Sequence, residues 1–484
     1  MQLISLEFFL FFALTLFLYN IAPRGARWLI LLLSSLAFYL LAGIFAFIYI
    51  LVMSLSSFVL ALFMQGRQQE GSGFSLALYI GVLLLLTGWL ILKLLAPSGS
   101  VVLPLGISFY SLRIISYLVD VKRKRIAAER NFLKYLLFVS YFPLILQGPV
   151  ARYSEISGRL FSGESATLEG SAAGLLLFMW GVFKKSVIAN TLASPIAKIV
   201  GGGEKYPGAY VLFLICFYTA EIYCDFSGGI DVIRGASLML GIELPRNFDR
   251  PFSSLSLREF WNRWHISLGE WFEKYVFFPL SLSRPMQRLS RRARARFGSK
   301  KGRKIPLYIA TMATWLLTGL WHGIRQNFIA WGVINGGLIL LSQELAPLRA
   351  KFHARYPGIR NKKRLWSALN KMRVFFIIGA TRLLDLYGSV GLTFRMLGSI
   401  FVNPNSPARL FSELPTIIPT RALAVVLCAL GVVYVVGKLN LKADSIAKNP
   451  IRCAAAIFSL ALLSLVFGEY GIGFDAGDFI YSRF

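Results

Sequence analysis

Long apolar runs separated by short basic segments recur along the whole chain. The first run covers residues 5–22, and residues 28–64 form a second run of 37 residues without a charge. Because a membrane-crossing helix needs about 20 apolar residues, the second run predicts two helices, with the break near Ser54–Ser57. Further spans are expected at 74–96, 131–146, 174–193, 210–222, 306–321, 327–341, 374–402, 421–437 and 453–467. The pattern predicts an all-α polytopic membrane protein with roughly 10–12 crossings.

The charges around the first runs predict an orientation. Residues 5–22 lack a basic segment before them, so they are interpreted as a retained span and not as a cleaved signal. Arg24 and Arg27 follow, which predicts a cytoplasmic first loop and an amino terminus outside. Residues 104–117 mix Gly, Ser and Tyr with apolar residues, a pattern typical of a re-entrant helix. Residues 154–169 are expected to form a polar surface segment.

The stretch 258–275 combines aromatic and charged residues. Mostly aromatic residues recur along it at steps of three or four: Trp261, His265, Leu268, Phe272 and Tyr275. This spacing places them on one face of a helix, and Trp264 flanks that face. Tryptophan favours the membrane interface, so the stretch predicts one continuous amphipathic interfacial helix. His265 has two interpretations here, a packed and hydrogen-bonded histidine or a functional one.

A second histidine follows the uncharged run 306–321. Polar residues at steps of three, four and four form a stripe on this otherwise apolar helix: Thr311, Thr314, Thr318 and His322. In a membrane helix such a stripe usually faces other helices or a wet cavity. Histidine can act as a general base near neutral pH, which makes His322 a candidate catalytic residue. A hydrogen-bonded seam for helix packing is the alternative interpretation.

Eight motifs follow one another from about residue 104 to about residue 340. They are Pro104–Tyr110, Ile115–Asp120, Gln147–Tyr153, Gly181–Lys185, Tyr223–Gly228, Gly241–Phe248, Arg258–Leu280 and Trp321–Gly323. As an ordered set they resemble the membrane-bound O-acyltransferase (MBOAT) family, in the bacterial branch of the alginate O-acetyltransferase and teichoic acid D-alanyl transferase. The resemblance implies one membrane-embedded domain over residues 1–484, with its catalytic core at about 104–340. Where related proteins often carry an acid after the lysine pair, this chain has Asn190.

Composition and charge support a membrane protein. Hydrophobic residues make up 56% of the chain and charged residues 15%, against about 25% charged in ordinary globular proteins. The net charge is +29, and basic residues without acids gather in two segments, 284–304 and 349–373. Both segments are predicted as cytoplasmic loops that contact anionic membrane lipid. No nucleic-acid-binding motif accompanies the charge, and the four cysteines show no metal-ligand spacing, so neither nucleic acid nor a metal is expected.

Two polar pairs interrupt apolar runs. Lys184 and Lys185 are interpreted as contacts to lipid headgroups, with contact to a cofactor phosphate as the alternative. Asp225 and Asp231 follow a short predicted span, where capping of a helix start is simpler than metal or acid–base chemistry. The family resemblance nevertheless keeps Asp225 among the candidate site residues.

The resemblance implies acyl transfer from a thioester to a hydroxyl. His322 would be the base that activates the hydroxyl, because a low dielectric disfavours the charged imidazolium. His265 would orient the acceptor or polarise the thioester carbonyl. Asn327 and Asn335 are candidate oxyanion donors. The other candidates for substrate contact are Trp261, Trp264, Trp321, Thr318 and Asp225.

The resemblance also implies where the substrates lie. The donor would be acetyl-CoA or an acyl-carrier thioester in the cytoplasm, and no bound cofactor is expected. The acceptor would be a cell-surface polysaccharide, or an extracytoplasmic partner protein that carries the acyl group, at the bacterial cytoplasmic membrane. D-alanyl transfer to teichoic acid is the main alternative. Transport of a lipid-linked sugar would predict inverted repeats, which we do not find, and an electrostatic scaffold would depend on the basic segments alone.

Overall fold

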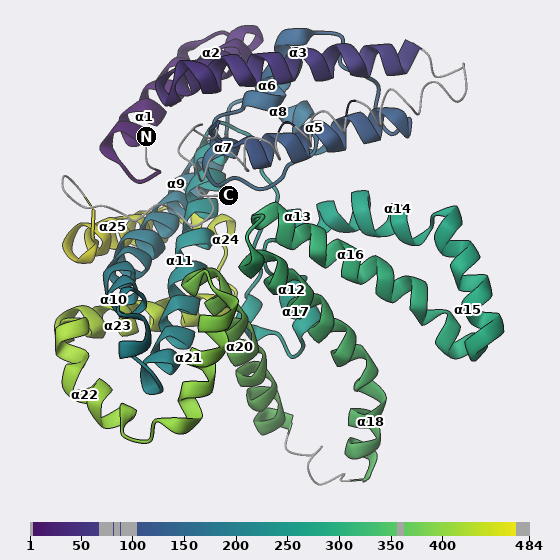
Figure 1. Ribbon diagram of the computed structural model, residues 1–484. Helices are drawn as coiled ribbons and strands as arrows, with labels where there is room; N and C mark the ends of the chain where they lie inside the picture. The colour runs from purple at the N-terminus through teal and green to yellow at the C-terminus, as the bar shows by residue number, and fades with distance from the viewer. Residues whose placement is uncertain (1–2, 67–80, 82–87, 89–103, 356–362, 471–484) are drawn as a thin grey trace. The chain divides into compact units, whose positions relative to one another are not determined.

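The computed structural model describes residues 3–66, 81, 88, 104–355 and 363–470. These residues form helices joined by turns, with one isolated β-bridge between Phe248 and Trp264 (Figure 1). Seven helices in this part are long and apolar enough to cross a membrane: Arg24–Ala42, Ile44–Gly66, Leu168–Gly201, Ala209–Met239, Gln326–Leu348, Thr420–Lys438 and Pro450–Phe467. The all-α membrane class is therefore confirmed. The predicted span 74–96 lies almost wholly outside the described residues, and the count of 10–12 crossings stays a prediction.

The chain divides into two compact units, which are described separately. The first unit comprises Met1–Thr191, Tyr223–Pro245 and Val425–Phe484, and the second comprises Leu192–Ile222 and Arg246–Ala424. Helices within the first unit are α1 (Leu6–Ile21), α2 (Arg27–Ala42), α3 (Ile44–Gly66), α5 (Ile107–Lys122), α6 (Phe132–Ser140), α7 (Pro143–Leu146), α8 (Tyr153–Ser162), α9 (Leu168–Phe183), a π-helix (Lys184–Ala189), α24 (Ala443–Ala447) and α25 (Pro450–Phe467). Helices α10 (Asn190–Gly201), α11 (Ala209–Met239) and α23 (Thr420–Lys438) include residues of both units.

The break between α2 and α3 lies at Gly43, and the predicted break near Ser54–Ser57 is wrong. Gly43 has φ 126° and ψ 147°, a conformation that a residue with a Cβ rarely adopts. The two serines lie inside α3, where the Ser57 hydroxyl donates to the carbonyl of Met53 at 2.6 Å. A serine that satisfies its hydroxyl within its own helix does not interrupt that helix.

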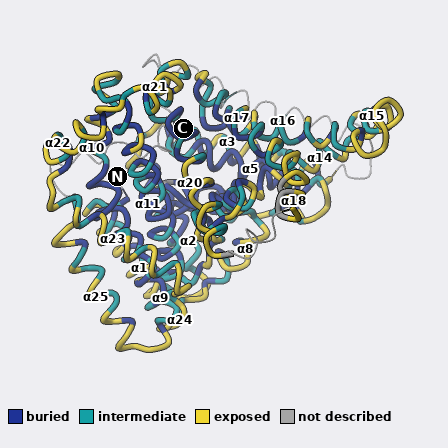
Figure 2. Tube along the Cα trace, turned by 90° about the horizontal axis from the view of Figure 1, so that it is seen from below, coloured by how far each residue is buried: buried dark blue, intermediate teal, exposed yellow. Residues whose placement is uncertain are grey.

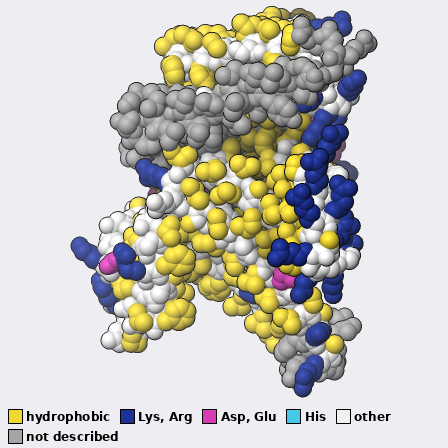
Figure 3. All heavy atoms as spheres, turned by 45° about the vertical axis from the view of Figure 1, so that its right-hand side comes forward, with side chains coloured by type: hydrophobic (Ala, Val, Ile, Leu, Met, Phe, Trp, Pro, Cys, Tyr) yellow, Lys and Arg dark blue, Asp and Glu magenta, His cyan; other side chains and the backbone are white. Residues whose placement is uncertain are grey.

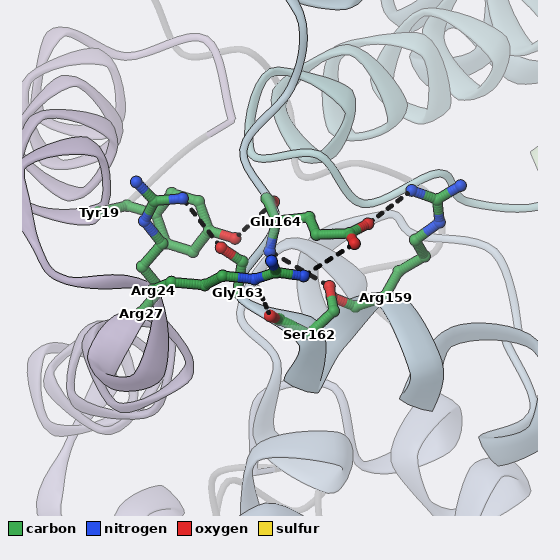
Figure 4. Close-up of polar contacts among 7 residues, drawn as sticks. All are labelled: Tyr19, Arg24, Arg27, Arg159, Ser162, Gly163 and Glu164. Carbon is green, nitrogen blue, oxygen red and sulfur yellow. Dashed lines mark hydrogen bonds and ion pairs between the residues drawn. The ribbon is translucent and has the colours of Figure 1, made fainter.

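Hydrogen bonds and an ion pair connect the loop between α1 and α2 to the segment that follows α8 (Figure 4). The Arg24 guanidinium lies 2.9 Å from the Glu164 carboxylate, and Arg27 donates to the Gly163 carbonyl at 2.8 Å. The Arg24–Glu164 ion pair is largely exposed, so it contributes at most about 1 kcal/mol. The contacts of Arg24 and Arg27 place the predicted polar surface segment 154–169 beside the loop that joins α1 and α2.

We expect Gly163→Ala to lower stability by at least about 2 kcal/mol. Gly163 has φ 64°, and a Cβ there would lie 2.1 Å from the backbone oxygen of Arg24. Gly158→Ala is the matched control, because this glycine lies inside α8 and a Cβ added to it would have no heavy atom within 4 Å. Thermal unfolding in detergent should show Gly158→Ala unchanged or stabilised by up to about 1 kcal/mol. Equal midpoints for the two variants would contradict the prediction.

The second unit carries the aromatic stretch and both basic segments. Its helices are α12 (Leu257–Trp261), α13 (Ile266–Phe272), a π-helix (Glu273–Phe277), α14 (Phe278–Ser281), α15 (Arg284–Gly302), α16 (Lys304–His322), α17 (Gln326–Glu344), α18 (Ala346–Arg355), α20 (Lys363–Tyr387), α21 (Val390–Val402) and α22 (Ser406–Ile417). Short 3₁₀ turns occur in the described residues of the two units at Arg24–Ala26, Gly203–Lys205 and Pro251–Ser253.

The basic segment 284–304 is helical, and its assignment as a cytoplasmic connection between membrane spans stays a prediction. It forms α15, which Ser283 caps through its side chain and which bends at Gly298 with φ 77°. Arginine, alanine and lysine all favour helix, and this propensity outweighs the charge repulsion. Helix α15 is mostly exposed (Figure 2), and its Lys and Arg side chains form a strip in Figure 3. In the second segment, 349–373, the described residues likewise belong to helices, α18 and α20.

Candidate active site

The aromatic stretch is broken at His265, so the prediction of one continuous helix is wrong. Helix α12 ends at Trp261 and α13 begins at Ile266. Between them His265 adopts φ 49° and ψ 52°, the left-handed conformation that is uncommon for residues other than glycine. Backbone strain of this kind gathers at functional sites, because only a surrounding network can hold it.

Asn247 holds His265 in this conformation. Its side-chain oxygen accepts from the Ser267 amide at 3.0 Å and from the Ser267 hydroxyl at 2.8 Å. The same oxygen lies 3.1 Å from Nδ1 of His265, and the Asn247 carbonyl accepts from the amide of Ile266 at 3.0 Å. Because the Ser267 amide can only donate, the atom facing it is the oxygen, and Nδ1 of His265 is then the donor. Nε2 therefore carries the lone pair of the neutral ring.

His265 is held neutral as well as oriented. It is buried and lies outside the candidate membrane spans. Burial, with a smaller contribution from the positive charge of Arg382, lowers the pKa of His265 to about 3. The ring can therefore accept a hydrogen bond through Nε2 at neutral pH.

We expect Asn247→Leu to impair both folding and activity. Leucine has nearly the same volume but offers no acceptor to the buried donors of His265 and Ser267, which costs about 1–3 kcal/mol for each group. Asn247→Asp keeps the acceptor oxygen and serves as the matched variant. Thermal unfolding and turnover should both rank the asparagine first, aspartate second and leucine last. A leucine variant as stable as the aspartate variant would contradict this role.

Both histidine rings lie close to the ring of Trp321. His322 is the last residue of α16 and is buried, and its ring centroid lies 5.0 Å from that of Trp321 and 5.1 Å from that of Trp331. The His265 ring lies 6.3 Å from Trp321. Residues 57 positions apart in the sequence are thus gathered at one aromatic cluster. This cluster is the candidate active site.

Tryptophans from three elements build the rest of the cluster. Trp261 lies 5.6 Å from Trp331 and 4.9 Å from Trp315, both edge to face. Trp264 stacks on Phe260 at 5.5 Å. The predicted aromatic residues Trp261, Trp264 and Trp321 are therefore all part of one packed region of the second unit. Their contact with a substrate stays a prediction.

A buried ion pair in this region was not predicted from the sequence. The Arg382 guanidinium lies 5.8, 5.3 and 5.2 Å from the ring centroids of Trp261, Trp264 and Trp331. Arg382 also pairs with Asp385 at 3.0 Å, and both side chains are about 5% exposed. Two opposite charges three positions apart within the apolar run 374–402 were the available signal. The Arg382 guanidinium thus lies among three tryptophan rings, a cation–π arrangement that is stronger when it is buried.

Close approach of α16 and α17 places His322 beside Trp331. A Cβ on Gly319 would lie 2.5 Å from the backbone oxygen of Phe328, and a Cβ on Gly332 would lie 2.5 Å from that of Trp315. The threonine hydroxyls of the predicted stripe form hydrogen bonds within their own helix. Thr311, Thr314 and Thr318 each donate to the carbonyl four residues earlier in α16, at 2.8 to 2.9 Å.

The two candidate oxyanion donors are buried and already donate to backbone carbonyls. The Asn327 amide donates to Leu384 at 3.2 Å, and the Asn335 amide donates to Trp331 at 2.9 Å. These bonds tie α17 to α20 and stabilise α17 itself. Each amide nitrogen has a second hydrogen, so a role toward an oxyanion stays a prediction.

The lysine pair and Asp225 belong to the first unit. The structure contradicts the interpretation of the lysines as headgroup contacts and of Asp225 as a helix cap. Lys184 and Lys185 are buried and do not reach headgroups: Lys184 lies 2.7 Å from Asp231, and Lys185 contacts Asp225. Asp225 lies in the middle of α11, not at a helix start, so the capping interpretation is wrong. The pairs join the π-helix after α9 to α11, and α9 itself approaches α11 closely at Gly181. Asp225 is thus placed in a charge network of the first unit.

Comparison with known proteins gives a family match and several relatives. The model of the membrane-bound O-acyltransferase family matches residues 31–293, a range that includes His265 and ends before His322. The probable alginate O-acetylase AlgI of Pseudomonas syringae pv. tomato is 36% identical over 241 residues, 49% of this chain and 42% of that protein. A peptidoglycan O-acetyltransferase of Helicobacter pylori is 29% identical over 303 residues, 57% of this chain and 54% of that protein.

A more distant relative is named for a different activity. The teichoic acid D-alanyltransferase of Streptococcus thermophilus is 28% identical over 246 residues, 49% of this chain and 56% of that protein. The matched segments thus span about half the length of these relatives.

Proposed function

Because the chain belongs to the membrane-bound O-acyltransferase family, we propose that it is a transmembrane O-acyltransferase. It moves an acyl group, acetyl in our proposal, from a cytoplasmic thioester to a hydroxyl outside the cytoplasm. The observation that carries the proposal is that the rings of His265 and His322 both lie close to Trp321. Two buried imidazoles beside an aromatic cluster suit a reaction that needs one base and one hydrogen-bonding group.

The reaction is nucleophilic substitution at the thioester carbonyl. His322 takes the proton of the acceptor hydroxyl while the hydroxyl oxygen attacks the carbonyl carbon. The carbon–sulfur bond then breaks, and the proton passes to the departing thiolate, so that ester and free thiol are the products. His265 is held neutral by its surroundings and orients the acceptor or contacts the carbonyl region without adding charge.

The proposed donor is acetyl-CoA or an acyl-carrier thioester. The acceptor is a hydroxyl of a cell-surface polysaccharide or of a partner protein that carries the acyl group onward. The names of the relatives support this class, since alginate, peptidoglycan and teichoic acid are all envelope polymers. The protein works in the bacterial cytoplasmic membrane, where the donor lies on one side and the acceptor on the other. The basic helix α15 contacts anionic lipid there.

Ester-linked acyl content of envelope polysaccharide tests this proposal. Base treatment releases the acid, and mass spectrometry identifies it, in the wild type, a deletion strain and a complemented strain. We expect ester to disappear on deletion and return on complementation, with acetate released. Release of alanine instead of acetate would indicate that the transferred group is D-alanyl, which is the group named for the streptococcal relative. Unchanged ester in the deletion strain, once redundant enzymes are removed, would favour a transporter or a scaffold instead.

A further inference from the structure

Arg382 connects helix α20 to a neighbour of each histidine in the candidate active site. Its guanidinium lies 5.2 Å from the ring centroid of Trp331, and that centroid lies 5.1 Å from the ring centroid of His322. The guanidinium also lies 5.3 Å from the ring centroid of Trp264, the residue immediately before His265 in the chain. All five residues belong to the second unit. One buried side chain thus packs against a neighbour of both imidazoles.

Trp264 and His265 are positioned as one piece of backbone. Trp264 forms the isolated β-bridge with Phe248, and the amide of Ile266 donates to the Asn247 carbonyl at 3.0 Å. These contacts hold the backbone on both sides of His265, whose left-handed conformation is narrow for a residue with a Cβ. A shift of the Trp264 ring is therefore transmitted to the imidazole next to it.

Asp385 holds the Arg382 guanidinium in place on α20. The two side chains lie three positions apart on one face of the helix and pair at 3.0 Å, with 4% and 6% exposure. The Asn327 amide donates to the carbonyl of Leu384 at 3.2 Å, which ties the same turn of α20 to α17, the helix that carries Trp331. The guanidinium is thus held in a fixed position beside the tryptophans.

We propose that Arg382 is a positioning residue of the candidate active site. By packing against Trp264 and Trp331, it fixes the two histidines relative to one another. The inference rests on the proposed acyl transfer, in which one imidazole takes the hydroxyl proton and the other orients the acceptor. A misplacement of about 1 Å can slow an enzyme about 10²-fold, so a residue that touches no substrate can control turnover. A buried cation close to aromatic rings suits this task, because burial strengthens the contact.

Balancing the charge of Asp385 is the alternative role, and one double variant separates the two roles. Arg382→Met alone leaves Asp385 buried without its opposite charge, so the unfolding midpoint should fall. Arg382→Met combined with Asp385→Asn leaves no charge to be desolvated, so the midpoint should return close to that of the wild type. If Arg382 positions the tryptophans, this stable double variant still transfers acyl groups at least about tenfold more slowly than the wild type.

Arg382→Lys separates the positive charge from the shape of the guanidinium. Lysine still pairs with Asp385, so the variant should unfold at nearly the wild-type temperature. Its compact ammonium group cannot lie against several rings as a planar guanidinium does, so its rate of acyl transfer should fall between those of the wild type and the double variant. Charge balance alone would give the lysine variant the full rate.

The experiment expresses the full chain and its variants in the deletion strain at matched protein levels. The rate at which base-releasable acyl ester accumulates on envelope polysaccharide after induction measures activity. Thermal unfolding of the same proteins, purified in detergent, measures stability. We expect the double variant to be close to the wild type in stability and well below it in rate, with the lysine variant stable and intermediate in rate.

Arg409→Met with Glu413→Gln is the matched control. Arg409 pairs with Glu413 at 2.8 Å within α22 of the same unit, and its guanidinium lies 5.9 and 5.7 Å from the ring centroids of Tyr206 and Tyr210. This control also removes an arginine from a helix that pairs with an acid and packs on aromatic rings, but those rings are not in the histidine cluster. It should keep the wild-type rate.

A double variant as stable and as fast as the wild type would overturn the positioning role and leave Arg382 as the counter-charge of Asp385. Where the double variant does not fold, the lysine variant decides, and a stable lysine variant with the full rate would overturn the role. A wild-type chain that restores no ester would instead overturn the proposed acyl transfer, and this inference with it.

Discussion

Replacing His322 with glutamine is expected to reduce the turnover of acyl transfer by about 10²–10⁴ while the protein stays folded. Glutamine fills most of the space between Trp321 and Trp331, so packing is largely preserved. It cannot accept the hydroxyl proton, and the loss therefore falls on the chemical step. Turnover should fall with little change in KM, as expected when an interaction of the transition state is removed.

Thr311→Val provides the control for this substitution. Thr311 lies on the same polar stripe of α16, and its hydroxyl donates to the Leu307 carbonyl of its own helix. Valine keeps the shape and removes only that bond, so activity should stay within about twofold of the wild type. Ester content of the envelope polysaccharide and turnover of purified protein are the two measurements. A glutamine variant with wild-type turnover would show that His322 is structural.

The features predicted correctly from the sequence depend on local pattern. Apolar runs of sufficient length predicted membrane helices, because a helix in lipid must satisfy its own backbone and be apolar along its length. The motif resemblance led to the right family, and the two motifs that carry His265 and His322 do meet at Trp321. Periodicity also predicted that Trp261 belongs to an aromatic cluster. The predicted helix over 258–275 is nevertheless interrupted, because α12 ends at Trp261.

The errors have long-range causes. His265 leaves the helix because Asn247, eighteen positions earlier, accepts from it and from Ser267. No helical period reports such a contact. Asp225 was interpreted as a cap because the lysine that it contacts lies 40 positions away. Gly43 is different, since its positive φ is a local property of glycine and could have been weighed above the serines at the expected break.

Charges inside apolar runs were the least used signal. Arg382 with Asp385, and Lys184 with Asp231, all lie in or beside predicted spans, and neither pair was predicted to form a buried ion pair. A charge at such a position must find a partner or a wet surface, because its desolvation otherwise costs several kcal/mol. The number of acids and bases inside an apolar run therefore predicts an ion pair, although not which two residues form it.

Removing one member of the Lys185–Asp225 pair is expected to cost about 3–5 kcal/mol of stability. Both side chains are buried, at 8% and 12% exposure, so the remaining charge loses its opposite charge without gaining water. Lys185→Met and Asp225→Asn are the single variants. The double variant, with both charges removed, should recover most of the loss, because no charge remains to be desolvated. The two single losses add to about 6–10 kcal/mol while the double variant loses little, so the coupling energy from unfolding midpoints should be at least about 4 kcal/mol.

The double variant also decides the role of Asp225, which the family resemblance left among the candidate site residues. If the carboxylate only balances Lys185, the double variant is folded and transfers acyl groups at close to the wild-type rate. We expect this result, because Asp225 already contacts the ammonium group of Lys185, its buried opposite charge. A double variant that is stable but inactive would instead make Asp225 part of the reaction. Additive losses in the two single variants would show that the pair contributes no mutual stabilisation.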